Sequence, residues 1–171
     1  GGGDADYNDI VGDWVIAPTA GALAVGPSLD DLGWWSSSAD DVTGRADLFD
    51  DIFRFNSDGS FENVQEGSTW VESWQDGQGD GNRAPVAPHD GSNAATYDAN
   101  TGTITISGTG AHLGIPKPYS GGELSDPANA PASINYEIVS LTPSELVVGL
   151  NIGSGYWQFS FVKSATGDNG G

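Results

Sequence analysis

The chain has 171 residues, among them 6 Trp, 6 Phe and 5 Tyr, with no Cys or Met and a formal net charge of −19. This length suits one domain with one substantial core, and the charge excludes binding to nucleic-acid phosphates or anionic lipid. The lack of Cys excludes disulfides, thiolate metal sites and cysteine catalysis, and no apolar run approaches the roughly 20 residues of a membrane span, so membrane insertion is not expected.

The acidic residues are mostly aspartate, which favours turns over helix interiors. Together with 26 Gly, they indicate loops between strands. Stretches rich in Gly and Asp predict flexible linkers at residues 1–9 and 165–171, around a single domain at 10–164. We therefore expect a secreted, extracellular or cell-surface module that these linkers join to a parent multidomain protein.

Short apolar or alternating stretches recur along the chain in ten segments, from which we expect about nine strands. The candidate segments are residues 13–17, 48–56, 60–64, 69–75, 95–97, 103–107, 111–115, 134–140, 145–150 and 156–163. In 48–56, an alternation of period two places Phe49, Phe53 and Phe55 on one face, with the acidic Asp51 between them. The following Ser-Asp-Gly predicts a hairpin turn with Gly59 at positive φ.

One short helical turn is expected after Ser38, because Asp41 follows three residues later in a capping-box pattern. The rest of the pattern is all-β. Sequential hairpins favour an antiparallel up-and-down β-barrel of about eight or nine strands with long loops. A β-sandwich of the jelly-roll type is the alternative. Two long irregular stretches, residues 76–93 and 116–131, are typical of functional loops.

Several motifs together resemble lipocalin-like bacterial domains, which open with a Gly-x-Trp strand and close with a Leu-Thr-x-x-Glu-Leu hairpin. The motifs are GDW at 12–14, FRFNSDGSF at 53–61, TYDANTGTITI at 96–106 and YEIVSLTPSELVVGLNIGSGYWQFSFVK at 136–163. The resemblance implies an up-and-down barrel with a cup-shaped interior.

Other runs resemble an uncharacterised module of secreted marine bacterial proteins, which often adjoins family 16 glycoside hydrolase domains. These runs are PTAGALAVGP at 18–27, WWSSS at 34–38, TWVESWQ at 69–75, APHDGSNAATY at 87–97 and GIPKPYSGGELSDP at 114–127. This second resemblance implies a carbohydrate-related or cell-surface role and assigns no ligand residues.

Tryptophans are the first candidates for ligand contact, because sugar rings stack on indoles while their hydroxyls bond to polar side chains. If the pair Trp34–Trp35 is extended, one side chain fills the barrel and the other faces solvent as a stacking platform. On a strand, Trp70 and Trp74 share one face with Glu72 between them. That face is then either a wet groove or a place where Glu72 pairs with an arginine.

Two loops add polar candidates. The first supplies His89, Asp90 and Asn93, either to a structural turn or to a ligand. The second supplies Tyr119 and Glu123 from a Pro-braced loop, which is either structural or placed at the barrel mouth.

Two further residues in this set are expected to be structural. Lys117 is expected to pair with a neighbouring acid. Trp157 shares a strand face with Phe159 and Phe161, which favours a place in the core.

Calcium is the candidate metal, since Asp76, Asp80 and Asn82 offer oxygen ligands on a Gly-rich loop. The spacing is not that of an EF-hand, and His89 and His112 match no zinc-ligand spacing. No cofactor is required for the function predicted below.

A glycoside hydrolase needs two carboxyl groups across the scissile bond, and Asp51, Glu62, Glu72 and Glu123 are available. No glycosidase signature accompanies them, so we expect no enzymatic activity. The sequence predicts a non-catalytic carbohydrate-binding module that recognises polysaccharide, or another glycan, by aromatic stacking and Asp/Asn hydrogen bonds. The alternatives are a structural or adhesion module of a cell-surface protein or filament, stabilised by calcium, and a glycoside hydrolase.

Overall fold

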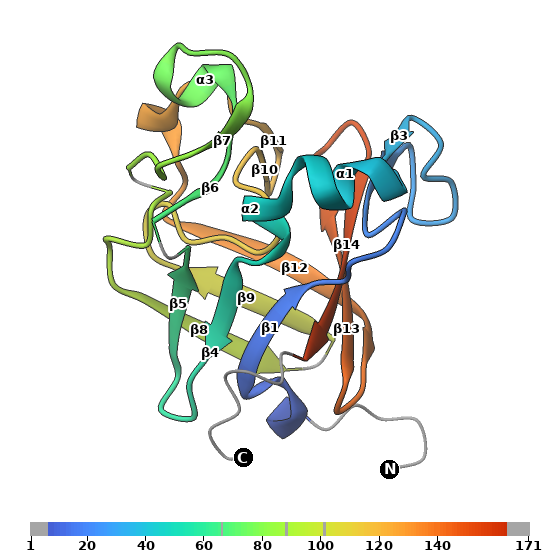
Figure 1. The fold of residues 1–171 in the computed structure, drawn as a ribbon. Coiled ribbons are helices and arrows are strands. Elements are labelled where there is room, and N and C mark those ends of the chain that lie inside the picture. The colour runs from blue at the N-terminus through green and yellow to red at the C-terminus, as the bar shows by residue number, and fades with distance from the viewer. Residues whose placement is uncertain (1–6, 66, 88, 101, 164–171) are drawn as a thin grey trace.

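Eight antiparallel strands form a closed barrel (Figure 1). The computed structural model describes residues 7–65, 67–87, 89–100 and 102–163. The barrel strands are β1 (Gly12–Ile16), β4 (Ile52–Phe55), β5 (Ser60–Val64), β8 (Ala95–Asn100), β9 (Thr103–Ser107), β12 (Ser133–Leu141), β13 (Glu145–Asn151) and β14 (Tyr156–Lys163). Each pairs with the next in this order, and β1 pairs with β14 to close the sheet. The predicted up-and-down barrel is therefore confirmed, and the jelly-roll alternative does not apply.

The first strand of the barrel is interrupted. β1 pairs with the end of β14, and β2 (Leu23–Gly26) pairs with its beginning, where Val25 faces Trp157. A short β3 (Trp35–Ser36) then pairs with β2 and extends the sheet. Between β1 and β2 the chain leaves the barrel wall and runs to one end of the barrel. This path brings Trp35 close to β14.

Helices and short hairpins gather at one end of the barrel, which we call the mouth (Figure 1). They are α1 (Ala39–Gly44), α2 (Ala46–Phe49), α3 (Ser73–Asp76), the pair β6 (Thr69–Val71) and β7 (Gly81–Arg83), and the pair β10 (Pro118–Tyr119) and β11 (Gly122–Glu123). The 3-10 helix η1 (Tyr7–Ile10) lies at the opposite end, and a second 3-10 helix, η2 (Pro127–Asn129), precedes β12.

Large side chains fill the barrel interior. The largest that are fully buried are Trp14, Phe53, Phe55, Phe61, Tyr136, Phe159 and Phe161. The predicted alternation in β4 and β14 supplies four of these aromatic rings. These side chains make the interior a packed core, and an open pocket lies at the mouth.

Residues 111–115 were predicted as a strand, and this prediction is wrong. The segment is buried, but it lies in no strand. The amide group of Asn63 hydrogen-bonds to the backbone N–H and C=O of His112, at 3.2 and 2.8 Å, and the Leu113 N–H donates to the Tyr136 hydroxyl. At Gly114, a Cβ would lie 2.7 Å from the Phe159 ring. Side chains inside the barrel thus satisfy this backbone in place of a neighbouring strand.

The strand predicted at 48–56 begins only at Ile52, because the preceding residues form α2. Leu48 and Phe49 are both buried there. Adjacent residues can share a buried face on a helix, whereas on a strand they point to opposite faces. Phe49 therefore does not share a strand face with Phe53 and Phe55. The predicted turn is confirmed, with Gly59 at a φ of +93°.

The predicted terminal linkers are described only in part. Residues 1–6 and 165–171 lie outside the described residues, while Tyr7–Ile10 form η1. Within the described ranges, no helix has the length and apolar character needed to cross a membrane.

Candidate functional site

An open pocket of about 340 Å³ lies at the mouth, and we call it the mouth pocket. Its lining combines three tryptophans, two glutamates, two basic residues, three aliphatic residues and one serine. These residues are Trp34, Trp35, Trp157, Glu72, Glu123, Arg45, Lys117, Val25, Ile115, Ile152 and Ser154. They come from segments spread along the whole chain, which the closure of the barrel brings together.

Both tryptophans of the adjacent pair reach solvent, with 56% of Trp34 and 37% of Trp35 exposed. The prediction that one of them fills the barrel is therefore wrong. Trp35 lies on β3, outside the barrel wall, where its ring contacts Trp157 at 6.1 Å between centroids. The Trp34 ring lies against Gly155, where an added Cβ would come within 2.7 Å of it. Packing on a glycine holds Trp34 in place and leaves much of its surface open.

Arg45, at the junction of α1 and α2, lies against the rings of Trp35 and Trp70. Its guanidinium carbon lies 5.3 Å from the centroid of the Trp35 ring and 4.5 Å from that of Trp70. Both distances are typical of cation–π contacts. Its nearest carboxylate, Asp41, is 3.9 Å away. The aromatic rings, more than any ion pair, hold this cation beside the pocket.

Two indole N–H groups orient the two glutamates of the pocket. Trp157 donates to Glu123 at 2.7 Å, and Trp74 donates to Glu72 at 2.9 Å. Each carboxylate is thus held at one oxygen. Trp157, predicted to lie in the core, is indeed mostly buried, but one part of it lines the pocket.

The segment TWVESWQ does not form the predicted strand. β6 ends at Val71, Glu72 and Gln75 form a capping box for α3, and Gly77, at a φ of +79°, ends the helix. Trp70 and Trp74 therefore do not share a strand face. Glu72 lines the open pocket and makes no ion pair with an arginine among the described residues, so neither predicted alternative, a groove along a shared tryptophan face or an arginine pair, describes it.

Trp70 and Trp74 lie behind the mouth pocket and do not line it. Trp70 is half-buried against Arg45, and its indole N–H is buried with no hydrogen-bond partner in the described part of the chain. Trp74 packs edge-on against His89, at 5.6 Å between ring centroids.

His89 belongs to a buried pair with His112, whose ring centroid is 5.9 Å away. Burial, and secondly the neighbouring His112, lower the pKa of His89 to about 3, and burial lowers the pKa of His112 to about 4. Both rings are therefore neutral at pH 7. His89 does not line the mouth pocket.

The other polar candidates form local structure. Asp90 accepts hydrogen bonds from the Ser92 hydroxyl and N–H, which keep the pKa of Asp90 below its ordinary value. Asn93 donates to the Thr109 carbonyl at 3.0 Å. Tyr119, on β10, packs against the core, whereas Glu123 on the facing β11 reaches the mouth pocket.

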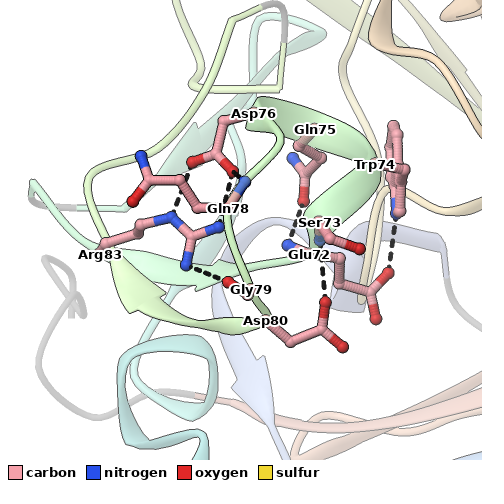
Figure 2. A network of polar contacts seen from close by, with 9 residues as sticks. All are labelled: Glu72, Ser73, Trp74, Gln75, Asp76, Gln78, Gly79, Asp80 and Arg83. Carbon is pink, nitrogen blue, oxygen red and sulfur yellow. Dashed lines mark hydrogen bonds and ion pairs between the residues drawn. The ribbon is translucent and has the colours of Figure 1, made fainter.

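The three residues predicted to bind calcium contact other parts of the chain, and Figure 2 shows the contacts of two of them, Asp76 and Asp80. Asp76 forms a two-bond ion pair with Arg83, both bonds at 2.7 Å, which lowers the pKa of Asp76. Asp80 accepts from the Ser73 N–H. Asn82 donates to a carbonyl of the α1 helix, that of residue 44. Over the described ranges, no group of three or more His, Asp or Glu is placed to hold a metal ion, so the calcium site stays a prediction.

The structure thus brings Trp34, Trp35, Glu72 and Glu123 together and adds Arg45, Lys117 and Trp157 to them. Sequence reasoning considered Arg45 only as one of three arginines that Glu72 could pair with, and not as part of a ligand site. Arg45 could have been singled out because basic residues are rare in this acidic chain, which has only 5 of them.

No protein-family model matches the chain, and neither does any curated protein. The solved structures that are similar to it include two from Bacteroides. A lipocalin-like protein from Bacteroides uniformis has 14% identity and a TM-score of 0.42, over 91% of this chain and 99% of that one. An uncharacterised protein from Bacteroides eggerthii has 11% identity and a TM-score of 0.43, with the same two shares covered. Neither description names a ligand.

Proposed function

We propose that this chain is a carbohydrate-binding module that holds a sugar unit of a polysaccharide against Trp34 and Trp35. The observation that carries this proposal is that two adjacent tryptophans stay exposed beside an open pocket. Among the described residues, Val139 is the other large apolar side chain with comparable exposure. Exposed indoles next to a concave surface are typical of binding sites.

The chemistry of the pocket suits a sugar. Indole faces offer stacking surfaces for C–H groups, and carboxylates accept hydrogen bonds from hydroxyls. Trp34 rests on Gly155, Trp35 packs against Trp157, and the indole N–H of Trp157 orients Glu123. Little side-chain entropy would then be lost on binding, because these groups are already ordered.

The experiment is affinity electrophoresis through gels that contain neutral or acidic polysaccharides. We expect at least one polysaccharide to retard the wild-type protein. Trp34→Ala and Trp35→Ala should each weaken binding about tenfold or more, equivalent to ~1.4 kcal/mol. Val139→Ala removes an equally exposed apolar side chain of the barrel wall and should leave binding unchanged. Retardation by no polysaccharide, or equal losses in all three variants, would contradict the proposal.

Hydrolysis is a second candidate, because two of the four carboxylates considered from the sequence meet in the pocket. Glu72 and Glu123 line it, whereas Asp51 is buried beside Thr69 and Glu62 accepts from Asn56 on an exposed face. The test is release of reducing ends from any polysaccharide that binds. Release that disappears in Glu72→Gln or Glu123→Gln would establish a hydrolase, and no release would leave binding as the function.

A further inference from the structure

We propose that the mouth pocket selects an anionic sugar, with one carboxylate or sulfate per unit, through Arg45 and Lys117. This inference rests on the proposed function and names the class of its ligand. It starts from the distribution of positive charge in a chain whose net charge is −19.

Three of the 5 basic residues are engaged within the fold. Arg54 makes two hydrogen bonds to Asp13, at 2.8 and 3.0 Å, and Arg83 is paired with Asp76. Lys163 donates to two backbone carbonyls, at 2.9 and 2.8 Å, and lies over the ring of Trp14. The remaining two, Arg45 and Lys117, are distant in sequence and line the same pocket.

Aromatic rings hold Arg45 in place, and its guanidinium N–H groups donate to no described residue. Only 18% of its side chain is exposed. Asp41, at 3.9 Å, is at the outer limit of an ion pair. Removing a guanidinium from water is costly unless its N–H groups find acceptors. A planar anion such as a carboxylate, or a sulfate, would provide them in the two-bond geometry that arginine favours.

Lys117 adds a second positive charge on the same lining. It was expected to pair with a nearby acid, but in the described part of the chain it forms no ion pair. An ammonium acts as a point charge that tolerates several positions of an anion. Arg45 and Lys117 together would therefore attract the anion, with Arg45 fixing its orientation.

The two glutamates limit how much negative charge the ligand can carry. Glu72 and Glu123 offset the two cations, so the pocket lining is neutral overall, inside a strongly acidic molecule. A ligand with dense charge, such as a nucleotide polyphosphate, would be repelled by both. A sugar with one anionic group and several hydroxyls matches the lining, because the hydroxyls can donate to the carboxylates.

The test is calorimetric titration with matched saccharides. The carboxylate arm compares trigalacturonate with its methyl ester, and the sulfate arm compares a carrageenan tetrasaccharide with its desulfated form. We expect the charged member of at least one pair to bind at least tenfold more tightly than the neutral member. Which arm shows the preference identifies the anion.

Variants connect this preference to the two cations. Arg45→Gln and Lys117→Gln should each remove most of the charge preference, and Arg45→Lys should restore part of it. Arg83→Gln makes the same change in net charge outside the pocket and should keep the preference. Circular dichroism reports whether Arg45→Gln folds, and Lys117→Gln, which removes a half-exposed charge with no ion pair, supplies the same test if it does not.

The outcomes separate this inference from the proposed function. Equal binding of charged and neutral saccharides that Trp34→Ala still weakens would overturn the anion preference and leave sugar binding standing. A charge preference that persists in Arg45→Gln and Lys117→Gln would also overturn it. Binding of no saccharide in either the titrations or the gels would overturn both.

Discussion

The tryptophans of this chain differ in what their indole N–H groups bond to. Trp14 donates to the Ile10 carbonyl, and Trp74 and Trp157 donate to glutamates. The N–H of Trp70 is buried without a partner among the described residues. A buried donor without a partner costs free energy, whereas a satisfied one contributes modestly. The same substitution should therefore have different effects at different positions.

Trp157→Phe should lower the free energy of unfolding by ~1–3 kcal/mol, because it leaves Glu123 without its 2.7 Å indole donor. Trp70→Phe is the matched control and should cost less, since it removes an N–H that has no partner. Urea unfolding of both variants measures the difference. A larger loss for Trp70→Phe would show that its contact with Arg45 outweighs the unpaired N–H.

The buried histidine pair makes stability depend on pH. The pKa of His89 is lowered to about 3 and that of His112 to about 4, mainly by burial, whereas an unfolded histidine titrates near ~6.5. The unfolded chain therefore binds protons first as the pH falls. Stability from this pair is present above about pH 6.5 and is lost as the pH falls toward the folded pKa values.

We expect wild-type stability to fall between pH 7 and 5, relative to the double variant His89→Gln/His112→Gln, by up to ~2 kcal/mol for each histidine. Comparison with the variant removes the opposing effect of reduced charge repulsion, which both proteins share. Urea unfolding at a series of pH values gives the two slopes. Parallel slopes would show that the histidines are not buried as neutral groups.

Single helices and strands could be predicted from the sequence where a segment carries only one type of pattern. Alternation predicted β14 and the β4–β5 hairpin, and the pair Ser38 and Asp41 predicted the start of α1. The segment 69–75 carries two signals in succession. A strand pattern gives way at Glu72 and Gln75, whose spacing is that of a capping box, and Gly77 then ends the helix. Counting alternation alone extended the strand too far.

The capping box of α1 gives a prediction for an element. The Ser38 hydroxyl accepts from the Asp41 N–H, and the Asp41 carboxylate accepts from the Ser38 N–H at 2.9 Å. Ser38→Ala should lower the free energy of unfolding by ~1 kcal/mol. Because Arg45 caps the other end of this helix, the variant should also weaken saccharide binding.

Ser38→Asp keeps a good capping side chain and serves as the control, with stability close to the wild type. Urea unfolding and gel retardation are measured on the same preparations. Loss of stability without loss of binding would show that Arg45 is positioned by its aromatic contacts alone, without help from the helix.

At the scale of the whole molecule, the barrel could be predicted and the pocket could not. Neighbouring strands in the sheet are mostly neighbours in sequence, so local hairpin signals add up to the fold. The mouth pocket instead joins residues as distant as Trp34 and Trp157. Arg45 and Lys117 could be recognised as the cations of the pocket only from the structure, which shows the partners of the other three basic residues. The alternation of β14 did predict the burial of Trp157, whereas no local pattern reports the exposure of Trp35 on β3.

Net charge gives the prediction for the whole molecule. At −19, the folded chain repels itself, and salt screens this repulsion over a Debye length of ~10 Å at 0.1 M and ~3 Å at 1 M. Raising NaCl from about 0.05 to about 0.5 M should therefore raise the Tm in a thermal unfolding scan.

Calcium can be compared with NaCl, because binding of calcium at a specific site would raise the Tm more than charge screening alone does. Asp76 is already bonded to Arg83 through both oxygens, and Asn82 presents its amide N–H₂ to the residue 44 carbonyl. Calcium binding in this loop would have to compete with Arg83 for the Asp76 carboxylate. We therefore expect CaCl₂ and MgCl₂ at equal ionic strength to raise the Tm equally. A larger rise with calcium, reversed by EDTA and abolished in Asp80→Asn, would instead establish the predicted site and show that the loop rearranges to bind the metal.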